Sequence, residues 1–171
     1  MPVVATVGQN PSIAKAHKQA KILIRYPFFQ QESDPTLVMQ KGSGMTTDTE
    51  ANKRNAIAFY EMAYLGNPVA AVEKYVGEEY IQHNPLVADG KNAFIAYFKE
   101  MARDYPGKSI EFIRAVAEEN LVALHTHQTW PGNEEYVTMD FFRFDENGKI
   151  VEHWDSIQVI PSESKNGNPM Y

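Results

Sequence analysis

The sequence predicts an α+β fold, with three helices packed on one face of a curved antiparallel sheet of four long strands and one short strand. Two observations lead to this prediction. Apolar side chains recur mostly at helical spacing up to residue 104, whereas apolar and polar residues alternate with the period of a strand from residue 109 to residue 160. Tight turn signals separate the alternating segments, and strands joined by tight turns pair antiparallel. Because each helix must bury its apolar stripe against the sheet, we expect a cone-shaped interior that admits a small ligand.

The helices are predicted from apolar periodicity together with start and stop signals. The first is expected over residues 50–65, with Asp48 or Thr49 as its N-cap. The second is short and follows over residues 68–76, and the third is expected over residues 92–104. Each has an apolar stripe that needs a partner surface, so the three helices form one layer.

The strands are predicted from alternation bounded by turn signals, and they cover residues 79–83, 109–118, 121–130, 136–144 and 149–160. The first strand ends at Asn84-Pro85, because the residue before proline avoids the helical region. Pro131-Gly132-Asn133 is a hairpin signal between two of the later strands. Strict alternation places Phe112 and Arg114 on the same side of the second strand.

Residues 1–44 differ from the rest of the chain and are interpreted as an N-terminal extension. Prolines interrupt them, and they carry a charge of +3, whereas the remainder carries −9. The extension could lie against its own acidic domain, lie against a partner subunit, or stay solvated. We expect the main domain over residues 45–161 and a frayed polar tail over residues 162–171.

Composition argues against several classes of partner and site. A net charge of −6 disfavours binding to nucleic acid or to an anionic membrane surface. The absence of cysteine excludes disulfides, thiolate catalysis and zinc–thiolate sites. We find neither an apolar stretch of transmembrane length nor a secretory signal pattern, so we expect a cytoplasmic protein.

Three motifs carry a family resemblance: residues 80–85 followed by Gly90, residues 139–144, and residues 148–155. In this order behind a helical start, they resemble the patterns of SnoaL-like proteins, a polyketide-cyclase group in the nuclear-transport-factor-2-like superfamily. The resemblance covers residues 48–161 and implies a cone-shaped, cystatin-like α+β barrel. The superfamily includes cyclases, isomerases, hydratases, epoxide hydrolases and non-catalytic binding proteins, so the fold alone does not choose a reaction.

The resemblance also implies a catalytic arrangement. The characterised cyclases of this group perform an intramolecular aldol condensation without metal or cofactor, so we expect neither here. The family pattern implies that Asp140 is the acid/base and that a histidine on the neighbouring strand, His125 or His127, assists it. A two-residue turn at Gly132-Asn133 would place His125 opposite Asp140, whereas a loop one residue longer would move both histidines to the other face.

The environment of Asp140 has two interpretations. The side chain stands in an apolar strand, and burial disfavours the ionised form of a carboxyl group, which suits a general acid or base. Alternatively, Asp140 lies on the solvent face and pairs with Arg114 or Arg143. The two strand histidines likewise could polarise a substrate oxygen, bind a metal with Asp140, or lie on the surface.

The motifs also supply candidate ligand-binding residues, namely Tyr80, His83, Phe142, His153, Trp154 and Asp155. His83 ends the first strand, where it either lines the pocket or ties down the following loop. His153 and Asp155 share one side of the last strand and Trp154 takes the other, so only one of these sets can face the pocket.

Two functions remain open from the sequence. The first is a cofactor-independent aldol-type cyclase or isomerase that acts on a small hydrophobic molecule bearing a carbonyl group. The second is a non-catalytic module that binds a ligand or dimerises. An enzyme should bring Asp140 and at least one imidazole together in an enclosed cavity, whereas a binding module should leave the ionisable groups outside it.

Because proteins of the resembled fold often pair through the open sheet face, we expect a homodimer. Size-exclusion chromatography with light scattering should give twice the mass of one chain. A strictly monomeric species at high protein concentration would contradict this expectation.

Overall fold

The computed structural model describes residues 48–132 and 134–171. Along the chain, its elements are α1 (Thr49–Tyr64), α2 (Pro68–Tyr75), β1 (Val76–Gln82), α3 (Lys91–Asp104), β2 (Ser109–Glu118), β3 (Leu121–Thr129), β4 (Glu135–Phe144) and β5 (Ile150–Val159). The predicted order of helices and strands is confirmed, although β1 begins directly after α2 rather than at residue 79. The expected N-terminal extension, residues 1–44, lies outside the described residues.

The five strands form one open sheet in the order β1-β5-β4-β3-β2. Strands β2 to β5 pair antiparallel as predicted, whereas β1 pairs parallel to β5. The expectation of an antiparallel sheet therefore fails at this edge. A hairpin forces antiparallel pairing only between strands that are close in sequence, and most of the domain separates β1 from β5.

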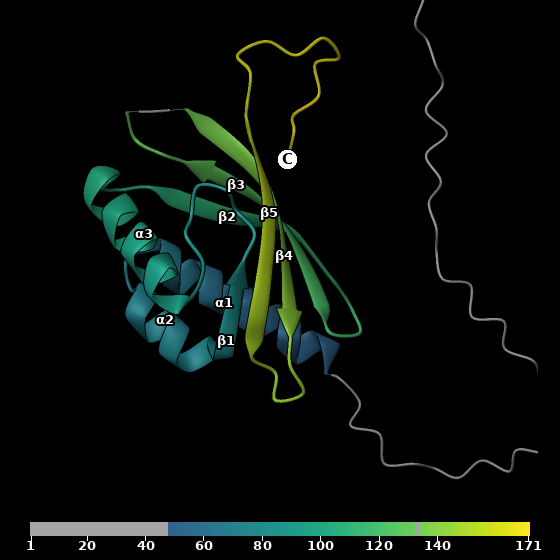
Figure 1. Ribbon diagram of the computed structural model, residues 1–171. Helices are drawn as coiled ribbons and strands as arrows, with labels where there is room; N and C mark the ends of the chain where they lie inside the picture. The colour runs from purple at the N-terminus through teal and green to yellow at the C-terminus, as the bar shows by residue number, and fades with distance from the viewer. Residues whose placement is uncertain (1–47, 133) are drawn as a thin grey trace, which may run out of the picture. The chain divides into compact units, whose positions relative to one another are not determined.

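The three helices lie on one side of the sheet, which we call the inner face, and the opposite side is the outer face (Figure 1). Helix α1 begins where the Asp48 side chain accepts a hydrogen bond of 2.9 Å from the backbone N–H of Ala51, which confirms Asp48 as the N-cap. It ends before Gly66, whose φ of +99° suits glycine. Among the described residues, no helix is both long and apolar enough to cross a membrane.

Aromatic rings from the helices and the inner face form the core. Phe59 of α1 is fully buried; it stacks on Phe94 of α3 with 5.1 Å between ring centroids and meets Phe142 of β4 edge-on at 5.9 Å. These contacts join both layers, because one side chain touches the helix layer and the sheet together. Such aromatic pairs add to the free energy gained by burying their surface.

A bulge in β2 changes the facing of its second half. The register with β3 shifts between Phe112 and Arg114. Phe112 packs against the core as Ala115 does, while Arg114 faces outward beside His125. The prediction that Phe112 and Arg114 share a side is wrong, because a bulge inserts one extra residue and reverses the alternation.

The chain beyond β5 forms neither helix nor strand from residue 160 to residue 171. The ring of Tyr171 nevertheless stacks on that of His127, with 3.9 Å between centroids. The end of this segment therefore contacts β3.

We expect Phe59→Ala to lower the free energy of unfolding by about 3–5 kcal/mol, because it leaves a cavity between the helix layer and the sheet. Urea denaturation followed by circular dichroism measures the change. Leu65→Ala is the control, since Leu65 is 62% exposed and its truncation should change stability by less than about 0.5 kcal/mol. Equal effects of both substitutions would contradict this account of the core.

Candidate active site

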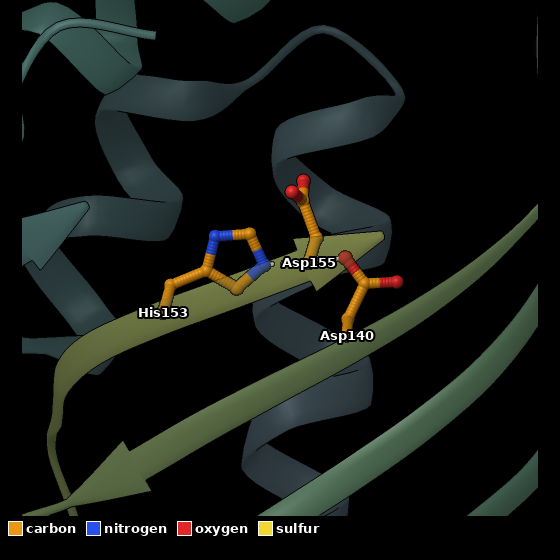
Figure 2. Close-up of side chains that lie close together, drawn as sticks. All are labelled: Asp140, His153 and Asp155. Atoms are coloured by element: carbon orange, nitrogen blue, oxygen red, sulfur yellow. Dashed lines mark hydrogen bonds and ion pairs between the residues drawn. The ribbon is translucent and has the colours of Figure 1, made fainter. Parts of the chain in front are cut away.

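Strands β4 and β5 bring three titratable side chains together on the inner face. Asp140 of β4 lies directly opposite Asp155 of β5, and Phe142 lies opposite His153. One ligand-type atom from each of Asp140, His153 and Asp155 lies within 4.8 Å of the others. Figure 2 shows the imidazole and the two carboxylates converging from the two strands in front of a helix.

Asp140 is fully buried and makes two polar contacts. Its Oδ1 lies 3.2 Å from Nε2 of His153 (Figure 2), and its Oδ2 accepts a hydrogen bond from the Thr138 hydroxyl. The His153 ring is held flat against Phe142, with 4.6 Å between ring centroids. The structure thus places Asp140 on the inner face, as the first of the two interpretations expects, and pairs it with His153.

The orientation of the His153 imidazole is set from β1. Nδ1 of His153 lies 3.1 Å from Oε1 of Gln82, and the same Oε1 accepts 2.9 Å from the backbone N–H of Asn84. A backbone N–H can only donate, so this Gln82 atom is the oxygen and Nδ1 must carry a proton. Nε2 then faces the Asp140 carboxylate, and one proton bridges the two groups.

Asp155 is half-buried and is held by a different partner. Its Oδ2 accepts 2.7 Å from the side-chain amide of Asn84. Burial raises the pKa of Asp155, the Asn84 hydrogen bond and the charge of His153 lower it, and the charge of Asp140 raises it, with a net upward shift. A carboxyl group with a raised pKa is a stronger base than an ordinary aspartate and can exchange protons closer to neutral pH.

A cavity of about 30 Å³ adjoins these groups. Six aromatic rings line it together with polar and aliphatic side chains; the rings are Tyr60, Tyr64, Phe94, Tyr97, Phe98 and Trp130. His153 and Asp155 line it too, whereas Asp140 is not among the lining residues. This volume accommodates about one or two waters, so a larger ligand requires the lining side chains to move.

Two buried phenols stand near the carboxylates. Burial raises the pKa of Tyr60 well above its usual value, and the nearby charge of Asp140 adds to the shift. Tyr60 therefore keeps its proton; its oxygen accepts 3.2 Å from Nε2 of Gln128, which leaves the hydroxyl proton for an acceptor in the cavity. Tyr80 is also buried, and its hydroxyl lies 3.3 Å from Nε2 of Gln82, behind the glutamine that orients His153.

The two histidines of β3 do not join this cluster. His125 lies opposite Met139, and Asp140 lies opposite Leu124. The loop thus corresponds to the longer of the two alternatives, and the placement of His125 opposite Asp140 is wrong. On the outer face, Nδ1 of His125 lies 3.0 Å from Nη1 of Arg114, and Nε2 of His127 lies 2.8 Å from Glu135.

His83 and Trp154 also lie on the outer face, which corrects the expectation that they line the cavity. Their rings stack with 4.8 Å between centroids, and Nε2 of His83 lies 2.9 Å from Glu152. Trp154 pairs with Phe141, which is 45% exposed. Since adjacent residues of a strand face opposite sides, this placement turns His153 inward, which is one of the two alternatives left open by the sequence.

The sequence patterns do not single out Gln82, Asn84 and Tyr60 as site residues. Gln82 and Asn84 follow Tyr80 with strand alternation, so the buried Tyr80 marks their side as inward. The titratable residue between them, His83, lies on the opposite side, against Trp154 and Glu152. Tyr60 belongs to the apolar stripe of α1, and helical spacing cannot separate a core ring from one whose hydroxyl reaches a cavity.

Comparison with known families agrees with this architecture. The model of the SnoaL-like domain matches residues 56–153, a span that contains Asp140 and His153 and ends two residues before Asp155. The chain belongs to the SnoaL-like family. The helix layer on an open, curled sheet is that of the nuclear-transport-factor-2-like superfamily. No curated protein matches this SnoaL-like chain.

Solved structures share the SnoaL-like fold at low identity. A candidate polyketide cyclase from Bacillus cereus is 16% identical, covers 73% of this chain and 81% of its own, and has a TM-score of 0.57. A candidate ketosteroid isomerase from Kribbella flavida is 19% identical, with coverages of 69% and 85% and a TM-score of 0.54. AclR, a candidate hydroxylase from Streptomyces galilaeus, is 18% identical, with coverages of 64% and 90% and a TM-score of 0.55. The three names differ, so the likeness shows the fold and not the reaction.

The stability of Asp155→Asn, compared with that of the wild type, should increase as the pH rises. The pKa of Asp155 in the folded state lies above the usual 3.8, so the unfolded state loses this proton first and wild-type stability falls as the pH rises above about 4. Asparagine does not ionise, so the variant does not lose stability in this way.

Thermal unfolding between pH 4 and pH 8 measures the effect as a difference in Tm between variant and wild type, which should move in favour of the variant. Asp104→Asn is the matched control, because the hydrogen bond from Arg103 lowers the pKa of Asp104, and it should show no such gain. A Tm difference for Asp155→Asn that is constant across the pH range would contradict the assignment.

Proposed function

We propose that this SnoaL-like protein is an acid/base enzyme that moves a proton at a carbon beside a carbonyl group, as an aldol-type cyclase or isomerase does. It uses its own side chains on a small hydrophobic substrate. The observation that carries the proposal is the position of Asp155. This carboxyl group has a raised pKa, lines an aromatic cavity, and stands beside the paired His153 and Asp140.

Asp155 is the proposed base. It takes the proton from the substrate carbon, and the electron pair of that bond moves to the carbonyl oxygen as an enolate forms. Asp155 can then return the proton to another carbon, which completes an isomerisation. Alternatively, the enolate carbon bonds to a second carbonyl carbon, and the oxygen of that carbonyl takes the proton back from Asp155, which completes an aldol closure. Asn84 holds Oδ2 of Asp155, so Oδ1 remains for the substrate proton.

The negative charge that develops on the substrate oxygen needs a donor or a positive charge nearby. The Tyr60 hydroxyl fits the first role, because the phenol stays protonated and lines the cavity. His153 fits the second, since both of its nitrogens face acceptors and the doubly protonated ring is positive. Asp140 then acts through His153, in place of the direct acid/base role that the sequence suggested.

The alternative is a SnoaL-like binding module without turnover. The enzymatic proposal is favoured by convergence, since Asp155 and an imidazole line one cavity and Asp140 contacts that imidazole. We also propose a homodimer that pairs through the outer face. Exposed apolar side chains there support this arrangement: Val116 is 64% exposed, Met139 47% and Phe141 45%. The cytoplasmic location stays a prediction.

Exchange of α-protons tests the proposed chemistry without knowledge of the natural substrate. The probes are hydrophobic β-diketones and β-keto esters in D₂O, and proton NMR follows the loss of the α-proton signal. We expect the wild-type protein to accelerate exchange of at least one probe in a saturable manner. Asp155→Asn should lower that rate by about 10²–10⁴-fold, the usual contribution of a general base.

Asp104→Asn is again the control, because Asp104 lies at the end of α3 and should leave the rate unchanged. Exchange that survives Asp155→Asn undiminished would defeat the assignment of the base. Saturable binding of the probes with no exchange above the buffer rate would favour the binding module instead.

A further inference from the structure

We propose that a buried, one-way series of hydrogen bonds keeps Asp140 charged and so keeps His153 doubly protonated. We call this series the donor chain, and it consists of Trp130, Gln128, Thr126 and Thr138. Under the function proposed above, the donor chain decides which of the two carboxylates serves as the base. Asp140 is held as a fixed anion, and proton exchange is left to Asp155.

The direction of the donor chain is set at its Trp130 end. The indole Nε1–H donates 3.2 Å to Oε1 of Gln128, and an indole nitrogen can only donate. This contact fixes which end of the Gln128 amide is the oxygen. The Nε2 group of Gln128 therefore points the other way. It donates 3.3 Å to Oγ1 of Thr126 and, on a branch outside the donor chain, 3.2 Å to the Tyr60 hydroxyl; Oγ1 of Thr138 lies farther away, at 3.5 Å.

The contact with Asp140 sets the donor direction of the two threonines. Thr138 donates its only hydroxyl proton to Oδ2 of Asp140. The two threonine oxygens lie 2.7 Å apart, so the proton between them must come from Thr126. Thr126 and Thr138 face each other across β3 and β4 and are 0% and 3% exposed. Every link therefore donates toward Asp140.

A chain that ends on a charged acceptor is stronger than the same bonds between neutral groups. Hydrogen bonds to a carboxylate are about twice as strong as neutral ones, and each donor in a series polarises the next. Protonation of Asp140 would forfeit this gain, so the proton that bridges Asp140 and His153 stays on Nε2. Gln82 accepts from Nδ1 at the same time, which fits a doubly protonated ring.

Three other titratable groups lie near Asp140 and His153, and none of them receives the donor chain. Tyr60 from α1 and Tyr80 from β1 stay neutral, because burial raises the pKa of both phenols well above the usual value. Asp155 from β5 accepts from the Asn84 amide, a neutral donor outside the donor chain. The two carboxylates on the inner face therefore differ in their hydrogen-bond donors: Asp140 accepts from the donor chain, and Asp155 accepts from Asn84.

The experiment measures the protonation state of His153 directly. The full chain is labelled with ¹⁵N, and the chemical shifts of the His153 ring nitrogens at pH 7 give the ratio of doubly to singly protonated ring; a His153→Asn sample assigns the signals. Thr138→Val removes the bond to Asp140 itself and should lower this ratio about tenfold, the loss of one hydrogen bond to a charged group. Thr126→Val acts one step away and should lower it about threefold.

Two further variants separate the donor chain from general damage to the sheet. Thr126→Ser keeps the hydroxyl and should restore the wild-type ratio. Thr129→Val lies on the same strand outside the donor chain and should leave the ratio unchanged. The graded order, with Thr138→Val stronger than Thr126→Val, is the result that supports a chain rather than a local contact.

An unchanged ratio in Thr126→Val overturns the proposal, as does an equal loss in Thr129→Val. If a threonine variant does not fold, Trp130→Phe carries the same test, because it removes the donor that orients Gln128; the ratio should fall, and an unchanged ratio overturns the proposal. This readout does not depend on turnover. If Asp155→Asn left the exchange rate undiminished, the proposed function would be contradicted, but the proposal of the donor chain would not be affected.

Discussion

The pairing of β4 with β5 is the constraint on which the candidate site depends. It places Asp140 opposite Asp155 and Phe142 opposite His153, so two carboxylates and an imidazole share the inner face. A shift of one residue in this register would exchange the inner and outer sets of side chains. The stacked ring of Phe142 then keeps the imidazole flat against the core.

Burial of two carboxylates is costly unless their oxygens find donors. Here the donors come from three directions. Thr138 lies on the same strand as Asp140, His153 lies on the neighbouring strand, and Asn84 follows β1 and reaches Asp155. The parallel strand β1 is therefore essential to the site, because Gln82 and Asn84 reach His153 and Asp155 only when that strand lies beside β5.

Titratable residues on the two faces of the sheet differ in their roles: those on the outer face form ion pairs, and those on the inner face form the candidate site. On the outer face, Arg143 forms an ion pair of 2.6 Å with Glu152, and Glu152 also lies 2.9 Å from Nε2 of His83. On the inner face, the raised pKa of Asp155 means that its charged form is disfavoured in the folded protein. A site that retains a disfavoured charge gives up stability for reactivity, as active sites commonly do.

Periodicity in the sequence determined the helices, the strands and their order, because burial of one side imposes a local repeat of 3.6 or 2 residues. The family motifs also marked Asp140, His153 and Asp155 as residues of interest. Local patterns could not decide which histidine meets Asp140, since this depends on the length of one loop. The side of the sheet on which Arg114 lies depends on a bulge in β2. The placement of Gln82 and Asn84 in the site depends on the parallel pairing of β1 with β5, two strands that are far apart in the sequence. Only the tertiary structure decided these points, because long-range pairing and not local propensity sets the register of strands.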